Sequence, residues 1–510
     1  MRRTRKVTSF LLILVLIIGL VPVPNGGDYI VFAEEASEKP TSGTCGDNIH
    51  WEITEDTVAG WDLAQSVPYQ LTLTGSGKMD FGTGKAPWYE HGYSPTITSI
   101  SMEEGITTIP NGAFYECASL KSITLPDSVT SIGASAISKC SLLETVNCGA
   151  GLKSIGAQAF LENPSLTSVR LQEGVETIER YAFGKCLKLK NIVLPDSVKT
   201  LGESCFSGTP LVSLKIPKNT ETIERNLVFD DRALERIQVS DENTHFMAVD
   251  NVLYELRDGV PFRAICYAPA SASNTVNIEE GTEQIERVAF AYANNITTLS
   301  LPSTLKKITE NAFFWCENIQ ELHIPDSVQS IENQAFAGCG LTKITVGKGL
   351  KELSGAIFQS CQNVKEVSIS KENPYMEVID NVVYNKAHTI LHYYAPAKQE
   401  TEYHVLDTVE YLDSYCIMKC DALRELYLPE TLISLESGAL TWNEGLNSIY
   451  FRGNAPSLGF VSINSNLQNL LIYRIPGTSG WDGSNWSELH LVDWDPNNIA
   501  EDSGSFDGET

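Results

Sequence analysis

The fold is decided by the stretch FLENPSLTSVRLQEGVETIERYA at 160–182, followed by FGKCLKLKNIVLPDSVKTLGESC at 183–205 and by Phe206, which opens a third copy. Within each copy, apolar residues return 6, 9, 11, 15 and 18 positions after the phenylalanine. A fixed period of roughly 20 to 50 residues is the signature of a solenoid. One such unit cannot bury its own apolar side, so it needs a copy of itself on each flank.

The same pattern runs through most of the chain. Units begin at His91, Phe114, Ile137, Phe160, Phe183, Phe206, Val228, Phe290, Phe313, Phe336, Phe358, Ile417 and Leu440. The steps from 228 to 290 and from 358 to 417 are longer, and each indicates an insertion of roughly 36 to 40 residues. Alternation in L-x-x-I-x-L is typical of a half-buried strand, and the compact AF-x-x-C segment favours a short helical turn. The sequence therefore predicts an α/β solenoid with one parallel strand per repeat of about 23 residues.

The chain has 510 residues, of which 42% are hydrophobic, and a formal net charge of −27. A single globular core rarely grows past about 300 residues, whereas a solenoid grows in one dimension. The acidic balance argues against nucleic acid and against an anionic membrane surface, because both require a basic face. It favours solubility and a basic or cation-bridged partner.

The 12 cysteines follow the repeat. Seven stand three positions after a unit start, where Asn163 and Asn443 take the same place in other units: Cys117, Cys140, Cys186, Cys316, Cys339, Cys361 and Cys420. Cys205, Cys416 and Cys148 occupy other core positions of the unit, and only Cys45 and Cys266 fall outside the pattern. The exchange with asparagine indicates buried side chains that serve the backbone, so we expect free thiols. No C-x-x-C pair supports a zinc site.

The two ends of the chain differ from the repeat. Residues 1–33 combine a basic start, an apolar core at 10–20 and a small-residue site at 31–33, which predicts a signal peptide and export. An uncleaved anchor is the alternative, but the apolar run is short for a span of about 20 residues. Residues 34–44 are expected to form a flexible linker, and the acidic segment 491–510 is expected to be a disordered tail.

Two segments are expected to cap the solenoid, which spans 91–470. Residues 45–90 are not repeat-like and read as a β-rich N-terminal cap, since the first coil of a solenoid needs a cover. Trp51, Trp61 and Trp88 offer the alternative of a sugar-stacking platform. Residues 471–490 form the C-terminal cap, in which Trp481 and Trp486 cover the last coil.

The insertions, near 240–280 and 370–408, resemble each other. DNVLY at 250–254 matches DNVVY at 380–384, and YAPA recurs at 267–270 and 394–397. The turn residues at 257–259 predict a hairpin, so we expect hairpins that stand off the solenoid and return to it. They are either elongated turns or a lateral contact surface built from Tyr254, Tyr267, Tyr384, Tyr393 and Tyr394.

Together, GTCGDNIHW at 43–51, LTLTGSGKM at 71–79, APWY at 86–89 and the repeat AF-x-x-C-x-x-L-x-x-I-x-L-P-D-S-V resemble the BspA-like class of bacterial leucine-rich-repeat proteins. The resemblance covers roughly residues 43–490. It implies a secreted or surface-displayed solenoid. Some members of the class serve as adhesins, so the resemblance does not imply one function.

The sequence gives little support for catalytic, sorting or metal-binding motifs. LPETL at 428–432 resembles a sortase signal, but it lacks the final glycine and is internal. His388 and His392 would lie about 13 Å apart on a strand, too far to share one ion. Carboxylates at the turns, such as Asp127, Asp196 and Asp326, read as turn residues that bond their own backbone rather than as a calcium ladder. We therefore predict no catalytic, cofactor or metal site.

The exposed position nine or ten residues after each unit start is the predicted binding surface. It comprises Ser101, Thr124, Asn147, Arg170, Val193, Lys215, Gln238, Ser300, His323, Thr345, Ser368, Tyr427 and Tyr450. Concave solenoid faces are common partner sites, and arginine and tyrosine are frequent binding anchors. The candidate partner-binding residues are Arg170, Lys215, Gln238, His323, Tyr427 and Tyr450. The alternative is a merely solvated face.

These observations predict an exported, monomeric, non-enzymatic leucine-rich-repeat protein that binds an extracellular protein or glycan through its solenoid surface. One alternative is a spacer without a specific ligand. Another is an enzyme whose site lies in the caps or insertions. The ligand itself is not encoded in any motif of the sequence.

Overall fold

The computed structural model describes residues 39–56, 67–463, 470–483, 485–487 and 489–496. The described residues from Ser42 onward form one compact unit, and residues 39–41 belong to a second. The predicted signal peptide lies outside the described residues. In the described part, helix is confined to α1 (Pro87–Glu90) and the 3₁₀ segments η1 (Ser94–Thr96) and η2 (Gly355–Phe358).

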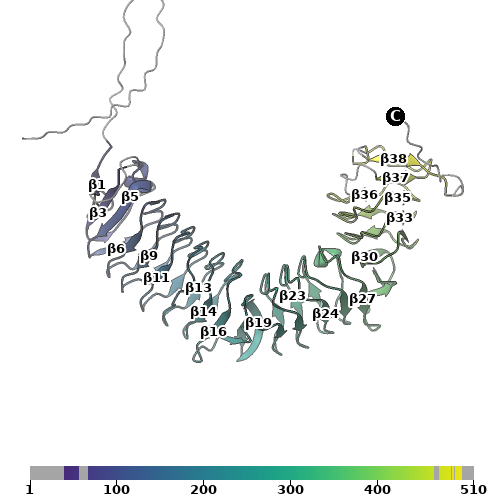
Figure 1. Cartoon of the computed structure of the whole chain (residues 1–510), viewed down its shortest axis with the longest axis horizontal. Helices are drawn as coiled ribbons and strands as arrows, with labels where there is room; N and C mark the ends of the chain where they lie inside the picture. Colours follow the sequence, from purple (N-terminus) through teal and green to yellow (C-terminus); the bar gives the residue numbers. More distant parts are fainter. Residues whose placement is uncertain (1–38, 57–66, 464–469, 484, 488, 497–510) are drawn as a thin grey trace, which may run out of the picture. The chain divides into compact units, whose positions relative to one another are not determined.

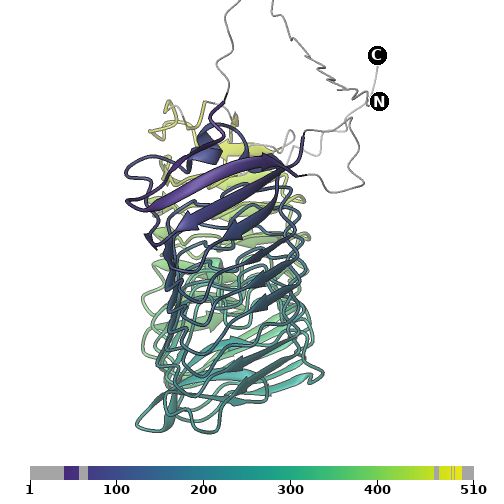
Figure 2. The same ribbon diagram turned by 90° about the vertical axis from the view of Figure 1, so that its left-hand side faces the viewer.

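The repeats form successive coils with parallel strands, as predicted (Figures 1 and 2). The first strand column comprises β5 (Ile97–Met102), β7 (Ser122–Thr124), β9 (Thr145–Asn147), β11 (Ser168–Arg170), β14 (Ser213–Ile216), β16 (Arg236–Val239), β20 (Thr275–Asn277), β22 (Thr298–Ser300), β24 (Glu321–Ile324), β26 (Lys343–Val346), β27 (Glu366–Ile369), β31 (Glu402–His404), β33 (Glu425–Leu428), β35 (Ser448–Phe451), β37 (Leu471–Arg474) and β38 (His490–Asp493). Equivalent residues pair, as Ile123 does with Val146 and Val146 with Val169. These apolar side chains are buried while their strand neighbours face solvent.

A second column of short parallel strands, which the sequence did not predict, lies farther along each coil. It comprises β4 (Gly77–Lys78), β6 (Ile106–Ile109), β8 (Ser131–Ile132), β10 (Ser154–Ile155), β12 (Thr177–Ile178), β13 (Thr200–Leu201), β15 (Thr222–Ile223), β21 (Gln284–Ile285), β23 (Lys307–Ile308), β25 (Ser330–Ile331), β32 (Tyr411–Leu412), β34 (Ser434–Leu435) and β36 (Ser457–Leu458). In most of these strands one apolar residue is buried, as Ile155 and Ile178 are. Each regular coil therefore hydrogen-bonds to the next along two lines.

The AF-x-x-C segment is a compact turn rather than the expected helical turn. The residues two positions before and two positions after the unit start have left-handed backbones, as at Gln158 (φ 60°) and Glu162 (φ 59°) around Phe160. A left-handed residue interrupts the regular hydrogen bonding of an α-helix. The backbone N–H of Phe160 instead donates to the carbonyl of Ala182 in the next coil, at 2.8 Å. The turn is thereby stabilised between coils and not within one.

The phenylalanines that open the units stack in a file, which confirms the predicted alignment. The ring centroids of Phe160 and Phe183 are 5.1 Å apart and those of Phe183 and Phe206 are 5.8 Å apart, with interplanar angles of 5° and 10°. A second file runs from Phe290 through Phe313 and Phe336. All of these rings are buried. Each ring thus hides the apolar flank of its neighbour.

The cysteines are buried free thiols, as predicted. The Sγ atoms of Cys140 and Cys186 each donate to the carbonyl of the phenylalanine 26 residues earlier, at 3.2 Å. Asn163 likewise hydrogen-bonds to the backbone of the preceding coil. Its Nδ2 donates to the Ile137 carbonyl at 2.8 Å, and its Oδ1 accepts from the backbone N–H of Cys140. Burial raises the pKa of the Cys140 thiol to about 12. Thiols in this state are poor nucleophiles.

The N-terminal cap is an antiparallel sheet of β1 (Ser42–Thr44), β2 (Ile49–Glu55) and β3 (Tyr69–Gly75), and β3 continues in parallel with β5. The C-terminal boundary of the predicted linker 34–44 is wrong, because Ser42–Thr44 already forms a strand that pairs with β2. Trp51 and Trp88 are buried, and Trp88 stacks on Phe114. The sugar-stacking interpretation is therefore wrong for these two residues. Trp61 lies outside the described residues.

The C-terminal end adds one more rung than predicted. β38 pairs in register with β37, so residues 491–493 belong to the strand column and not to a disordered tail. Trp481 and Trp486 are buried against Phe451, at 5.2 and 5.4 Å between ring centroids. The rest of the predicted tail from 497 onward lies outside the described residues.

Each insertion is a three-stranded antiparallel meander. The strands are β17 (Phe246–Val249), β18 (Val252–Arg257) and β19 (Val260–Tyr267), and then β28 (Met376–Ile379), β29 (Val382–Asn385) and β30 (Ile390–Tyr394). The hairpins exist, but they do not stand off the solenoid, because β19 and β30 join the second column in parallel with β21 and β32. Tyr267 and Tyr394 lie 23 residues before Phe290 and Ile417, so each long step contains a further coil.

The lateral contact surface suggested for the insertions is wrong. Its five tyrosines, at 254, 267, 384, 393 and 394, are between 0% and 4% exposed. Tyr267 stacks on Phe290 at 5.4 Å and so continues the phenylalanine file. Tyr393 packs on Phe358 at 5.5 Å. These tyrosines replace the missing phenylalanines of the two further coils and contribute to the core.

Candidate functional site

The residues nine or ten positions after the unit starts form an aligned outer face along the first strand column, as predicted. The register places Lys215 beside Gln238 and Tyr427 beside Tyr450. Arg170 lies beside Asn147, and His323 beside Thr345. The six predicted partner-binding residues therefore share a face, but they fall on four separate sheets. The structure groups them as local pairs rather than as one site.

His323 borders a shallow hollow on this face. The hollow has a volume of about 510 Å³ and is lined by polar side chains that include His323, Lys343 and Thr345. It lies where β22 and β24 belong to different sheets. We regard it as a secondary feature, because its walls offer no large anchoring side chain.

The C-terminal part of the face carries a stack of rings, which we call the tyrosine ladder: His404, Tyr427, Tyr450 and Tyr473. Successive ring centroids are 4.2, 4.3 and 4.5 Å apart, and successive planes are inclined by 8°, 4° and 10°. The rings come from β31, β33, β35 and β37, whose residues pair directly. Parallel pairing places identical positions one strand apart, so planar side chains stack face to face.

Trp494 lies across the edges of this ladder. Its ring centroid is 5.0 Å from that of Tyr450 and 6.2 Å from that of Tyr427, both at 61°. Its backbone N–H donates to the carbonyl of Arg474 at 2.8 Å, which fixes the residue beyond the end of β38. The ladder and Trp494 together form one aromatic surface at the C-terminal end of the column.

Charged groups border the ladder. The Tyr427 hydroxyl donates to Glu425 at 2.8 Å, and burial followed by this carboxylate raises the pKa of the Tyr427 phenol. Glu402 contacts the ring of His404. Arg452 pairs with Asp407 at 3.2 Å, and Arg474 with Asp493 at 3.0 Å. Both arginines already have carboxylate partners. The remaining carboxylates, Glu402 and Glu425, therefore give the border of the ladder an acidic character.

Sequence reasoning missed three members of this surface, His404, Tyr473 and Trp494. His404 stands 23 residues before Tyr427 and Tyr473 stands 23 residues after Tyr450, so the period alone would have found both. They were overlooked because His404 follows an insertion and Tyr473 was assigned to the cap. Trp494 carries no periodic signal, since it follows the last rung.

Two other groups singled out in the sequence have structural partners. His388 contacts Glu377, while Nδ1 of His392 lies 2.9 Å from Asp413. At the turns, Asp127 and Asp326 accept backbone N–H groups of the next coil, from Ala150 at 2.8 Å and from Lys348 at 2.9 Å. These carboxylates therefore accept hydrogen bonds from the neighbouring coil. The prediction that they bond the backbone of their own turn is wrong for these two residues. Among the described residues, no group of three histidines, cysteines or carboxylates is placed to hold a metal ion.

Asp231 has a buried carboxyl group that binds its proton more tightly in the folded protein than in the unfolded chain. Its oxygens accept from the backbone N–H groups of Leu211 and Ala233, at 3.1 and 3.0 Å. Burial nevertheless raises its pKa from 3.8 to about 7. Because the folded state binds this proton more tightly than the unfolded state, the stabilisation is complete below about pH 4 and is lost as the pH rises to about 7.

We expect Asp231→Asn to flatten this pH dependence. In the wild type, the Asp231 contribution should fall by up to about 1.4 kcal/mol per pH unit between about pH 4 and 7. Urea unfolding of both proteins across that range measures the difference in slope. Asp230→Asn is the matched control, because the Asp230 side chain is more than half exposed beside Arg232. An unchanged slope in the Asp231 variant would contradict the assignment.

With the geometry established, comparison with known proteins decides the family. A sequence profile described as the BspA type leucine rich repeat region, with 6 copies, matches residues 89–183, 153–248, 283–401 and 392–474. The chain belongs to the BspA-type leucine-rich-repeat family. No curated protein matches it significantly.

Three solved structures are similar to this chain, and the first two are described as leucine-rich proteins. A leucine-rich repeat protein from Eubacterium ventriosum is 20% identical, with a TM-score of 0.52, and the alignment covers 83% of this chain and 96% of that one. A leucine rich cell surface protein from Faecalibacterium prausnitzii is 21% identical over 66% of this chain and 96% of that one, with a TM-score of 0.42. The pneumococcal vaccine antigen PcpA is 16% identical over 89% of this chain and 100% of that one, with a TM-score of 0.40.

Within the part of this BspA-type chain that the structure describes, no helix has the length and apolar character needed to cross a bilayer.

Proposed function

We propose that this protein works outside the cell as a non-enzymatic binding protein, and that it holds a protein partner on the tyrosine ladder. The ladder is the observation that carries this proposal. Four rings lie at spacings of 4.2 to 4.5 Å on one outer face, where His404 is exposed and the three tyrosines are half-buried, and Trp494 extends the same surface. Export is supported by the basic and apolar segments at 1–33.

The orientation of the rings favours a protein over a glycan. Sugars stack on the faces of aromatic rings, but in the ladder each inner face is covered by the next ring. What the ladder offers is ring edges and hydroxyl groups, which suit side chains and peptide groups. Tyrosine is enriched at binding hot spots because it supplies a large contact area at a small cost in side-chain entropy. Mutual stacking lowers that cost further, since the rings are already ordered.

The charge around the ladder favours a basic partner. Arg452 and Arg474 are paired with Asp407 and Asp493, whereas Glu402 contacts the imidazole of His404 and Glu425 accepts from the Tyr427 hydroxyl. The whole chain carries a net charge of −27. Complementary potentials accelerate association and disfavour like-charged partners. We expect binding to weaken as the salt concentration rises, because exposed charges are screened.

Substituting the centre of the ladder tests the proposal. The mature protein is immobilised and exposed to host-matrix and bacterial-surface extracts, and a captured protein is then purified and titrated. We expect Tyr427→Ser/Tyr450→Ser to weaken its binding at least tenfold, since tyrosine hot spots commonly contribute about 2 kcal/mol or more each. Arg170→Ser/Lys215→Ser, on the same column but away from the ladder, is the matched control.

Three outcomes would contradict the proposal. Equal binding by the ladder variant would place the site elsewhere on the chain, and equal loss in both variants would indicate contacts along the whole strand column rather than on the ladder. Capture of glycans rather than proteins would contradict the partner class. Near-UV circular dichroism of each variant establishes that the rest of the fold is retained.

A further inference from the structure

The second strand column is interrupted at the first insertion. β15 pairs with β13, and β19 pairs with β21, but no pairing joins β15 to β19. In the preceding coil the N–H of Phe206 donates to the Leu227 carbonyl, whereas among the described backbone groups Val228 has no equivalent bond to the next coil. The two coils remain joined on the other side, where the N–H of Ala270 donates to the Leu234 carbonyl at 2.8 Å.

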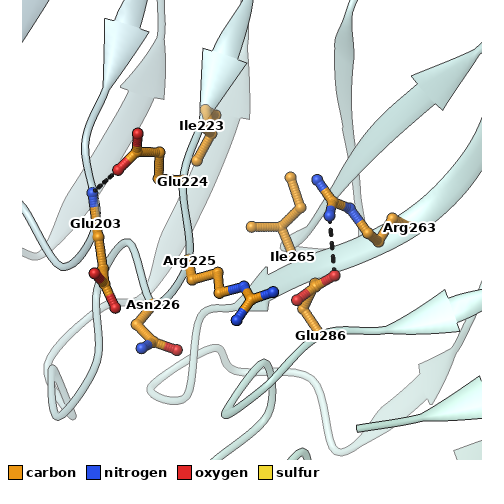
Figure 3. A pocket seen from close by; sticks show the side chains of 8 residues that line it. All are labelled: Glu203, Ile223, Glu224, Arg225, Asn226, Arg263, Ile265 and Glu286. Atoms are coloured by element: carbon orange, nitrogen blue, oxygen red, sulfur yellow. Dashed lines mark hydrogen bonds and ion pairs between the residues drawn. The ribbon is translucent and has the colours of Figure 1, made fainter.

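A cavity of about 430 Å³ opens at this interruption (Figure 3). Arg225 and Asn226 line it from one coil, Arg263 from the next coil, and Glu286 from the coil after that. Ile223 and Ile265 add apolar surface between the charged groups. This volume lies within the range of small-ligand sites, which bind through an apolar lining and a few placed polar groups.

The polar groups of the cavity are unequally satisfied. Arg263 is held by Glu286 at 3.1 Å and by Glu255 at 2.5 Å, yet its Nε is buried without a hydrogen-bond partner. The Oδ1 of Asn226 is also buried without a partner. Arg225 extends into the gap (Figure 3), and it forms no ion pair with any residue that the structure describes. The cavity thus presents a free guanidinium, one donor and one acceptor.

We propose that this cavity binds the carboxyl-terminal residue of a peptide. The terminal carboxylate pairs with the Arg225 guanidinium and accepts from Nε of Arg263, since arginine binds carboxylates through two parallel hydrogen bonds. The amide N–H of the same residue donates to Oδ1 of Asn226. An apolar side chain on that residue contacts Ile223 and Ile265. One ligand thus supplies a partner for Arg225, for Nε of Arg263 and for Oδ1 of Asn226.

The acidic groups of the cavity argue against a phosphate. Glu203 and Glu224 also line the cavity, so a dianion would face two further carboxylates. Glu224 already accepts from the backbone N–H of Glu203 at 2.9 Å. A phosphate would in addition leave the isoleucine side chains and the Asn226 oxygen without contacts. A singly charged carboxylate on an apolar residue matches the lining better.

N-acetylleucine and N-acetylleucinamide are the probes for a test on the full chain. They differ only in the terminal carboxylate, so the comparison does not depend on any variant. We expect the acid to bind at least tenfold more tightly than the amide in an NMR titration. We also expect inorganic phosphate to compete poorly. Equal affinity of acid and amide, or no binding of the acid, would overturn the proposal.

A matched pair of arginine variants locates the site. Arg225 and Arg180 hold the same repeat position, three residues before Val228 and Phe183, but the column is closed at the coil of Arg180, where β12 pairs with β13. Arg225→Met should weaken binding of N-acetylleucine at least tenfold, whereas Arg180→Met should leave it within twofold. Equal effects of the two substitutions would show that the acid is attracted by surface charge and would overturn the assignment to this cavity.

Discussion

Phe313→Ala should lower the free energy of unfolding by about 3–5 kcal/mol, the usual cost of removing a fully buried phenylalanine. Phe313 is 0% exposed and lies between Phe290 and Phe336, at 4.9 and 5.0 Å between ring centroids. Removing the ring leaves a cavity and uncovers one face of each neighbour. In a repeat protein each coil is stabilised mainly by the adjacent coils, so the loss affects both.

Trp315→Ala is the control for this substitution. Trp315 is two residues away in the same turn and is 42% exposed, so its removal should cost much less. Urea unfolding followed by far-UV circular dichroism measures both variants. If Phe313→Ala cost no more than Trp315→Ala, the aligned phenylalanine file would not be the core of the solenoid.

Asn163→Leu should destabilise the protein by several kcal/mol although leucine is apolar and of similar size. Asn163 is 0% exposed and makes three hydrogen bonds to backbone groups, to the carbonyls of Ile137 and Phe160 and from the N–H of Cys140. Leucine would leave the Ile137 carbonyl and the Cys140 N–H buried and unpaired, at about 1–3 kcal/mol for each group, whereas the Phe160 carbonyl keeps the Cys186 thiol as a donor. The side chain therefore stabilises the coil through its polar atoms.

The repeat supplies the control, because cysteine stands at the same position in neighbouring units. Asn163→Cys restores a donor to the carbonyl of Ile137 in the way that Cys186 donates to Phe160. We expect it to cost clearly less than Asn163→Leu in the same unfolding assay. If both substitutions were equally harmful, the interchange of asparagine and cysteine along this column would need another explanation.

Much of the fold follows from the period alone. A step of 23 residues between Phe160, Phe183 and Phe206 requires equivalent positions to align, whatever the local conformation is. The same reasoning placed the cysteines in a buried column and Tyr427 beside Tyr450. These predictions depend on register, and register is what the sequence of a repeat protein specifies most strongly.

The conformation within a coil was harder to predict. The second column uses strands of two residues, such as Thr177–Ile178, which are too short to show alternation. The segment after each phenylalanine has the composition of a helical turn. Its left-handed residues are varied, among them Lys185 (φ 55°) and Ser204 (φ 55°), and glycine takes the position in only some units, as at Gly208 (φ 65°). Contacts between coils impose these conformations, and such contacts are invisible in one unit.

The candidate sites lie where the repeat is altered. The coil that opens at Tyr267 was overlooked because tyrosine replaces phenylalanine and a strand replaces the turn before it. The cavity beside it depends on the absent pairing of β15 and β19, which no residue pattern reports. Departures from a period can be located in a sequence, but the shape of the resulting gap cannot.

The buried thiols have a consequence for the lifetime of the protein. In an oxidising medium the folded chain protects its cysteines, because each is packed in the core. Once a coil opens, thiols of neighbouring coils become free to oxidise to mispaired disulfides, and refolding is then blocked. In an oxidising medium, the lifetime of the folded protein would therefore depend on how rarely the coils open. The rate at which a thiol reagent alkylates the buried cysteines would measure that opening rate.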